Sequence, residues 1–315
     1  MHRPTARLLA TACLIAATAA HAAAQRLPAP PPDRFTVTSD GHEMAVWARL
    51  PEGPRAVVLL LHGRTWSSRP DFDLQVPGLQ RSVMQSLADR GIAAYALDFR
   101  GYGGTPRDAS GWLSPTRSAQ DTTNVLDWVR ARHPDLAPPA VLGWSRGAAV
   151  AQMVAQATPE KLSSLTVFGF AEPETGYVDL AQPEQPQRLE NTEASAKSDF
   201  ISPRVTPPSV MQAFAAQALR ADPVLADLTG DSEFNALSPE HVTVPTLVLF
   251  GERDPGVVIA EAATYFARLG TPDKQMVVLP GADHAAQVED THDAWIAAVV
   301  NFLTRPTAGP GTSGH

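Results

Sequence analysis

The stretch AVLGWSRGAAVA at residues 140–151 decides the fold, because it joins a short apolar run to an alanine-rich run through Gly143-Trp144-Ser145-Arg146-Gly147. This pattern predicts a strand, a tight turn and a helix, with Ser145 at the turn. The flanking glycines leave room for the two elements to approach each other, and the helix N-terminus stabilises negative charge beside the serine. Ser145 is therefore predicted to be an exposed nucleophile.

Two polar residues further along the chain also follow apolar runs. Asp254 comes just after the run 246–250, and His284 comes just after the run 275–279. Parallel strands bring their carboxyl ends to one edge of a sheet, which is where such folds place their sites. The order serine, aspartate, histidine predicts a catalytic triad of Ser145, Asp254 and His284. Glu172, which follows the apolar run 165–170, is an alternative acid.

The rest of the chain alternates short apolar runs with longer amphipathic ones. Residues 57–61 are all apolar, which is typical of a strand covered on both faces of a parallel sheet. The first two candidate strands alternate instead and suit an antiparallel edge. We therefore predict an α/β fold with a doubly wound, mostly parallel, eight-stranded sheet. The expected strands are Phe35–Thr38, Met44–Leu50, Ala56–Leu61, Ile92–Asp98, Ala140–Leu142, Leu165–Phe170, Thr246–Phe250 and Gln275–Leu279.

Helices are expected between these strands, one of them from an apolar stripe that begins at Leu79 and ends before Gly91. The stretch 172–240 is different, because it is rich in Pro, Gln and Glu at first and then offers only short helical candidates. A segment of this length without a strand signal predicts a cap or lid inserted between two parts of the core, 35–171 and 241–305. A partly disordered surface insertion is the alternative.

Taken together, these motifs resemble those of the α/β-hydrolase superfamily, from about Phe35 to Arg305. Residues 61–64 (LHGR) are similar to the His-Gly turn after the third strand, and residues 98–103 (DFRGYG) are similar to a structural turn of the family. The resemblance implies an oxyanion hole made by the backbone N–H groups of Arg64 and Arg146, with His62 as a support rather than a base. It implies no cofactor. Relatives that open epoxides or displace halide carry aspartate at the position of the serine.

Arginine at both oxyanion positions is unusual. One hypothesis is that at least one guanidinium group faces the pocket and favours a substrate with a carboxylate or another anionic group. The interpretation that we favour is that both side chains point away and pair with acids at the edge of the core, such as Asp98.

Three tryptophans, Trp66, Trp112 and Trp144, are candidates for the substrate pocket, although core packing explains large aromatic residues equally well. The histidines show no spacing typical of a metal site, so no metal is expected.

Residues 1–24 combine two arginines, an apolar run at 8–20 and small-x-small patterns at 20–24, which predicts a secretory signal peptide. A disordered alanine-rich terminus and a lipid anchor at Cys13 are the alternatives. Cleavage would remove Cys13, the one cysteine, and so exclude disulfides and thiol catalysis from the mature protein. A Pro-rich leader at 25–34 and a disordered tail at 306–315 are expected to flank the core. We expect a periplasmic or secreted protein.

The chain has 25 Lys and Arg against 33 Asp and Glu, a net charge of −8, which argues against nucleic acid or an anionic membrane surface as a partner. We therefore expect an exported serine hydrolase that cleaves a carboxylic ester or lactone, a small-molecule substrate, through an acyl-enzyme. A carbon–carbon bond hydrolase or an acyltransferase would use the same triad. A non-catalytic binding protein is a more distant alternative. The sequence leaves the oligomeric state open.

Overall fold

The computed structural model describes residues 29–170, 176–179, 183–202 and 204–306. The predicted signal peptide at 1–24 lies outside the described residues. The same is true of the alternative acid Glu172 and of the predicted tail beyond Pro306.

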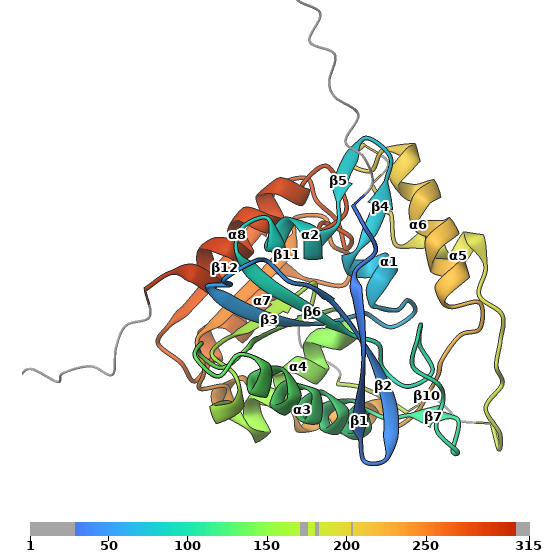
Figure 1. The fold of residues 1–315 in the computed structure, drawn as a ribbon, viewed down its shortest axis with the longest axis horizontal. Coiled ribbons are helices and arrows are strands. Elements are labelled where there is room, and N and C mark those ends of the chain that lie inside the picture. Colours follow the sequence, from blue (N-terminus) through green and yellow to red (C-terminus); the bar gives the residue numbers. More distant parts are fainter. Residues whose placement is uncertain (1–28, 171–175, 180–182, 203, 307–315) are drawn as a thin grey trace, which may run out of the picture.

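A central sheet of eight strands runs in the order β1-β2-β6-β3-β8-β9-β11-β12 (Figure 1). The pairs β1–β2 and β2–β6 are antiparallel, and the other neighbours are parallel. The predicted fold class and all eight expected strands are therefore confirmed. The bounds are β1 Asp33–Ser39, β2 His42–Arg49, β3 Ala56–Leu61, β6 Ile92–Leu97, β8 Ala140–Trp144, β9 Leu165–Phe168, β11 Thr246–Gly251 and β12 Lys274–Leu279. β1 includes the last two residues of the predicted Pro-rich leader, Asp33 and Arg34.

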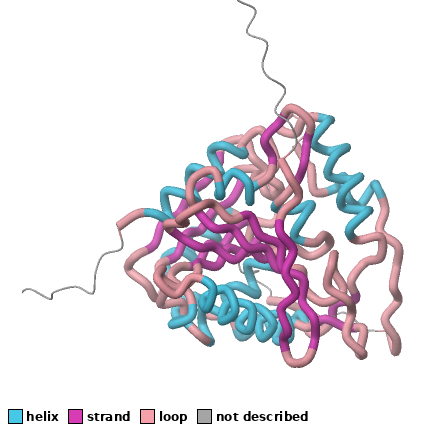
Figure 2. Tube along the Cα trace, in the orientation of Figure 1, coloured by secondary structure: helices cyan, strands magenta, loops and turns pink. Residues whose placement is uncertain are grey.

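The position of β3 inside the sheet explains why its sequence is apolar throughout. Val57, Leu59 and Leu61 belong to one hydrophobic core, whereas Val58 and Leu60 belong to another on the opposite face. Helices cover both faces, so successive side chains that point in opposite directions are all buried. One face carries α3 (Pro115–Arg132), α4 (Arg146–Ala157) and α7 (Ile259–Arg268), and the other carries α2 (Val83–Ala88) and α8 (His292–Thr304) (Figures 1 and 2). Within the described ranges, no helix is both long enough and apolar enough to cross a bilayer.

The predicted helix that begins at Leu79 is wrong in its first turn. Strands β4 (Leu74–Val76) and β5 (Leu79–Arg81) form a hairpin there, and Leu79 is exposed. The turn between them contains Gly78 at φ +77°, a conformation that glycine adopts without strain. Helix α2 begins only at Val83, after the Ser82 side chain caps it by accepting a hydrogen bond from the N–H of Gln85.

The described part of the stretch 172–240, called the cap below, packs against the core. Its helices α5 (Glu193–Ser198) and α6 (Pro208–Ala221) stand together at one side of the sheet (Figure 1), and α6 packs on α1 (Ser68–Phe72). Contrary to expectation the stretch also contributes a short strand, β10 (Asp227–Leu228), which pairs with β7 (Trp112–Leu113). Two 3₁₀ helices follow, at Asp231–Ala236 and Pro239–His241.

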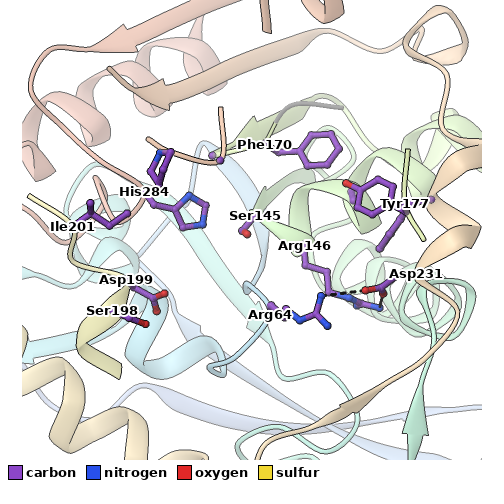
Figure 3. A pocket seen from close by; sticks show the side chains of 15 residues that line it. Arg64, Ser145, Arg146, Phe170, Tyr177, Ser198, Asp199, Ile201, Asp231 and His284 are labelled. Atoms are coloured by element: carbon purple, nitrogen blue, oxygen red, sulfur yellow. Dashed lines mark hydrogen bonds and ion pairs between the residues drawn. The ribbon is translucent and has the colours of Figure 1, made fainter. Parts of the chain in front are cut away.

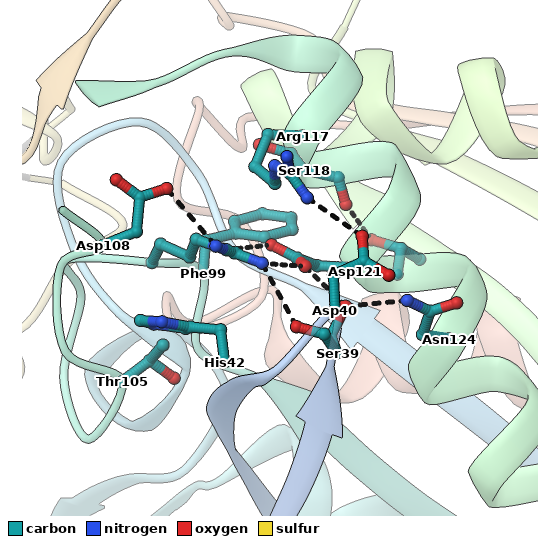
Figure 4. A network of polar contacts seen from close by, with 12 residues as sticks. Ser39, Asp40, His42, Phe99, Thr105, Asp108, Arg117, Ser118, Asp121 and Asn124 are labelled. Carbon is teal, nitrogen blue, oxygen red and sulfur yellow. Dashed lines mark hydrogen bonds and ion pairs between the residues drawn. The ribbon is translucent and has the colours of Figure 1, made fainter. Parts of the chain in front are cut away.

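The turn at 98–103 has the structural role that the family resemblance implies (Figure 4). Arg100 donates to both carboxylate oxygens of Asp121 on α3, at 2.7 and 2.8 Å, and to the backbone oxygen of Ser39 at the end of β1. The Ser39 hydroxyl in turn donates to Asp121 at 2.6 Å. This buried network ties the turn to α3 and β1, and so fixes the loops at the carboxyl edge of the sheet.

Candidate active site

Ser145 lies at the junction of β8 and α4 and has φ 53° and ψ −122°. A positive φ in a residue other than glycine costs of order 1–3 kcal/mol, so the surroundings must hold it. The N–H of Ser145 donates to the carbonyl of Phe168 at the end of β9, at 2.9 Å, and the N–H of Ala148 donates back to the carbonyl of Ser145.

The two glycines of the motif are required by close backbone contacts. A Cβ atom on Gly143 would collide with the carbonyl of Gly147, and one on Gly147 would collide with the carbonyls of Leu61 and His62. α4 therefore passes directly over the ends of β8 and β3, and this close approach presents Ser145 above the sheet edge.

Asp254 and His284 form the pair that the sequence predicts. They follow β11 and β12, and the His284 Nδ1 lies 2.9 and 3.0 Å from the two carboxylate oxygens of Asp254. Because a carboxylate only accepts, Nδ1 carries the proton and Nε2 is left free to act as a base. The Asp254 side chain is fully buried and also accepts from the N–H of Gly256 at 2.9 Å. His284 and Ser145 line the same cavity (Figure 3).

The pKa of His284 is raised above its ordinary value of 6.5. Burial opposes the charged imidazolium, but the hydrogen bond and negative charge of Asp254 outweigh it, with help from Asp199 and Asp283. The surroundings thus stabilise the imidazolium that would form after His284 accepts a proton.

The loop after β3 is held by buried polar groups. His62 accepts from the N–H of Phe99 through Nε2 at 3.1 Å, and its Nδ1 lies 2.9 Å from the carbonyl of Gly63. Burial lowers the pKa of His62 to about 3, so the ring is neutral and acts as a support, as expected. Asp71 accepts from the N–H of Gly63, and the Tyr102 hydroxyl donates to the carbonyl of Arg64.

The backbone N–H groups of Arg64 and Arg146 find no acceptor among the described residues. Arg146 is the first residue of α4, a position where no intrahelical acceptor exists. Arg64 lines a recess of about 50 Å³ together with Gly63 and Ser145. Arg146 follows Ser145 directly in the chain, so the oxyanion hole at these two residues stays a prediction.

The three candidate tryptophans are placed differently. Trp66 and Trp144 line the recess beside Ser145, and the Trp144 indole donates to the carbonyl of His284 at 2.9 Å. The Trp66 indole donates to Asp199 at 3.1 Å. Trp112 lies in β7 and lines neither of the two cavities that contain Ser145, because its pairing with β10 keeps it away from them.

A larger cavity of about 450 Å³ opens in front of Ser145 (Figure 3). Arg64, Arg146 and Asp231 line one side of it, and Asp199 lies on the other. The sequence analysis missed both aspartates. They belong to the cap, carry no motif, and reach the site only through the packing of the cap on the core.

The arginines pair with an acid, as favoured, but the named residue Asp98 is wrong. Asp98 accepts from the indole of Trp47 at 2.8 Å and from backbone N–H groups of its own turn region and α1, whereas both arginines pair with Asp231. Among the described residues, no group of three or more His, Cys, Asp or Glu is arranged to hold a metal ion.

A serine on a tight strand–helix turn, beside a buried Asp–His pair at the carboxyl edge of a doubly wound sheet, defines a hydrolase of the α/β-hydrolase superfamily. The sequence model of the family described as serine aminopeptidase, S33, matches residues 52–291, and the chain belongs to that family.

Solved structures of other hydrolases are similar in fold. E-2-(acetamidomethylene)succinate hydrolase is 22% identical, with a TM-score of 0.62 over 87% of this chain and 99% of that one. A thermophilic esterase from Thermogutta terrifontis is 20% identical, with a TM-score of 0.60 over 86% and 98%. Epoxide hydrolase A from Mycobacterium thermoresistibile is 18% identical, with a TM-score of 0.59 over 86% and 98%. No curated protein matches the sequence with significance.

Proposed function

We propose that the protein is an exported serine hydrolase that cleaves a carboxylic ester or lactone through an acyl-enzyme. The observation that carries this proposal is the Asp254–His284 pair, joined at 2.9 Å, in the cavity that also contains Ser145. Solved structures with this fold include an esterase and an epoxide hydrolase, so the reaction has to be argued from the site rather than from the fold.

In the proposed mechanism, Ser145 Oγ attacks the carbonyl carbon of the substrate while His284 Nε2 takes its proton. The C–O bond to the leaving alcohol then breaks, and the imidazolium returns the proton to the alcohol. Water attacks the acyl-enzyme in the same way and releases the acid. In a lactone the alcohol stays attached to the acyl group. Asp254 orients the ring and stabilises its positive charge throughout.

Negative charge develops on the carbonyl oxygen in both steps. We assign its stabilisation to the N–H groups of Arg64 and Arg146, which lack acceptors among the described residues. Losing one such donor typically costs about 3–4 kcal/mol of transition-state stabilisation.

Export is proposed from the sequence of residues 1–24, whose basic start, apolar run and small-residue cleavage patterns support a signal peptide. N-terminal sequencing of the protein recovered from the periplasm or the medium tests it. A start near residue 25 is expected, and an intact N-terminus in the cytoplasm would contradict export.

The hydrolase proposal is tested with protein lacking residues 1–24 and a panel of p-nitrophenyl esters of increasing acyl length, simple lactones and an aminoacyl p-nitroanilide. We expect turnover of esters or lactones, with a burst of product in step with acylation of Ser145. Ser145→Ala should lower kcat by at least about 1,000-fold while circular dichroism stays unchanged.

Each other outcome is informative. Cleavage of the anilide alone would show that the bond cleaved is an amide rather than an ester, in keeping with the description of the family as serine aminopeptidase. Turnover that survives Ser145→Ala would contradict the mechanism. A folded protein without turnover on the whole panel would favour the two other reactions of this triad, carbon–carbon bond hydrolysis and acyl transfer.

A further inference from the structure

We propose that the cavity in front of Ser145 binds a substrate that carries a carboxylate or a similar anionic group, and that the guanidinium groups of Arg64 and Arg146 hold that group. This inference rests on the proposed hydrolase function and names the substrate class of the same site.

The first argument is the charge balance of the cavity wall. Arg64 and Arg146 each lie 3.1 Å from a different carboxylate oxygen of Asp231, so one aspartate is shared by two guanidinium groups (Figure 3). No other carboxylate pairs with either arginine among the residues that the structure describes. On this wall of the cavity two guanidinium charges thus share one carboxylate, in a protein whose net charge is −8.

The second argument concerns the donors that remain. The Arg146 side chain is only 8% exposed, and its Nε is buried without a hydrogen-bond partner. Its guanidinium lies over the Phe234 ring, 5.2 Å from the ring centre, a cation–π contact that helps to hold it in place. Arg64 is 58% exposed at the mouth of the site, with one nitrogen on Asp231. A guanidinium has five N–H donors, so both arginines retain donors for a further anion.

The third argument is where the anionic group would lie. The two residues whose side chains form the positive wall are also those to which we assign the N–H groups of the oxyanion hole. An anionic group a few carbons from the scissile carbonyl would therefore reach the guanidinium groups while the carbonyl oxygen occupies the recess. The opposite wall carries Asp199, an acid that would repel an anion. This difference in charge between the two walls favours short monoesters of dicarboxylic acids, bound with the free carboxylate beside the arginines.

The test compares two esters of matched length, p-nitrophenyl hemiglutarate and p-nitrophenyl valerate, and follows the ratio of their kcat/KM values. The wild type should prefer the hemiglutarate. Arg146→Gln and Arg64→Gln should each lower the ratio by about tenfold or more, because a hydrogen-bonded charge pair is lost while the backbone N–H stays. Asp231→Asn should raise the ratio several-fold, because it frees both arginines from their competing carboxylate.

A matched control is Arg117→Gln, an exposed arginine on α3 that pairs with Asp40 away from the cavity. It should leave the ratio unchanged. Added salt should lower the wild-type ratio, because the attraction is electrostatic. If Arg146→Gln fails to fold, the exposed Arg64 and the Asp231 variant still carry the test.

The anionic substrate and the hydrolase activity are tested by different outcomes. A ratio that stays the same in all three variants, with both esters still dependent on Ser145, would overturn the anionic substrate and leave the hydrolase intact. A ratio that falls in Asp231→Asn would also overturn it. Turnover of both esters that survives Ser145→Ala would overturn the proposed function itself.

Discussion

At the residue scale, the environment of His284 is set by two parts of the chain that lie far apart in sequence. Asp254 supplies the direct hydrogen bond from the core, while Asp199 adds negative charge from the cap. Burial raises the pKa of Asp199 itself, and the indole of Trp66 donates to its carboxylate. The acid–base behaviour of the histidine therefore depends on the cap as well as on the triad.

The dependence of kcat/KM on pH measures the effect of this environment on His284. His284 accepts a proton only when neutral, so kcat/KM should rise with pH and reach half its maximum above pH 6.5, the ordinary pKa of histidine. Asp199→Asn removes a charge that favours the imidazolium, so it should move this midpoint down by about half a pH unit or more.

Asp231→Asn is the matched control for that profile, because Asp231 lines the same cavity but is not among the main charges that shift the pKa of His284. Its midpoint should stay near that of the wild type. A midpoint that Asp199→Asn leaves in place or moves upward would contradict the role of Asp199.

At the element scale, the site depends on how closely α4 approaches the ends of β8 and β3. The contact is made through Gly147, where a side chain would meet the carbonyls of Leu61 and His62. The next residue, Ala148, is a buried position inside the helix. Two neighbouring residues of similar size thus have different tolerance to one added or removed methyl group.

Gly147→Ala should lower the free energy of unfolding by about 3 kcal/mol or more and reduce kcat, because α4 must move away from the sheet and carry Ser145 with it. Ala148→Gly should cost only about 1–2 kcal/mol, from helix propensity and one lost methyl, with activity retained. Urea denaturation with a parallel ester assay measures both. Equal, small losses in the two variants would contradict the proposed contact.

The features that could be predicted are those that depend on short, local stretches of sequence. The turn around Ser145, the eight strands and the residues Asp254 and His284 all follow from short patterns and their position after apolar runs. The hairpin β4–β5 was missed because Leu79 fits the apolar stripe of the following helix. Asp199 and Asp231 were missed because only the packing of the cap brings them to the cavity, and no local pattern records that packing.

At the scale of the whole molecule, the cap is tied to the loop that carries His284 by a buried acid pair. Asp283 accepts from the N–H groups of Ile201 and Ser202, at 3.0 and 2.6 Å, and its own N–H donates to Glu289 at 3.1 Å. The Thr206 hydroxyl of the cap donates to Glu289 at 3.3 Å. Two carboxyl groups thus share a site that cannot hold two charges easily.

Burial and the neighbouring Asp283 raise the pKa of Glu289 to about 9, against an ordinary value of 4.5. The folded protein therefore keeps a proton that the unfolded chain loses above about pH 4.5. Stability from this group is fully present below that pH and is lost as the pH rises toward 9, by up to about 1.4 kcal/mol per pH unit. Glu289→Gln, which has no proton to lose, should gain stability relative to the wild type between pH 5 and pH 8.

Chemical denaturation of both proteins at several pH values within this range measures the difference. Curves of unfolding free energy that remain parallel from pH 5 to pH 8 would show that Glu289 is not protonated in the fold.

The positive φ of Ser145 has a consequence for how this protein can change by mutation. Glycine adopts φ 53° at little energetic cost, whereas serine is strained there. Selection for stability alone would therefore favour glycine at position 145, and selection for chemistry would oppose it. Activity and stability compete at this one position. A descendant that no longer needed the reaction could gain stability through the single substitution Ser145→Gly, which removes the nucleophile.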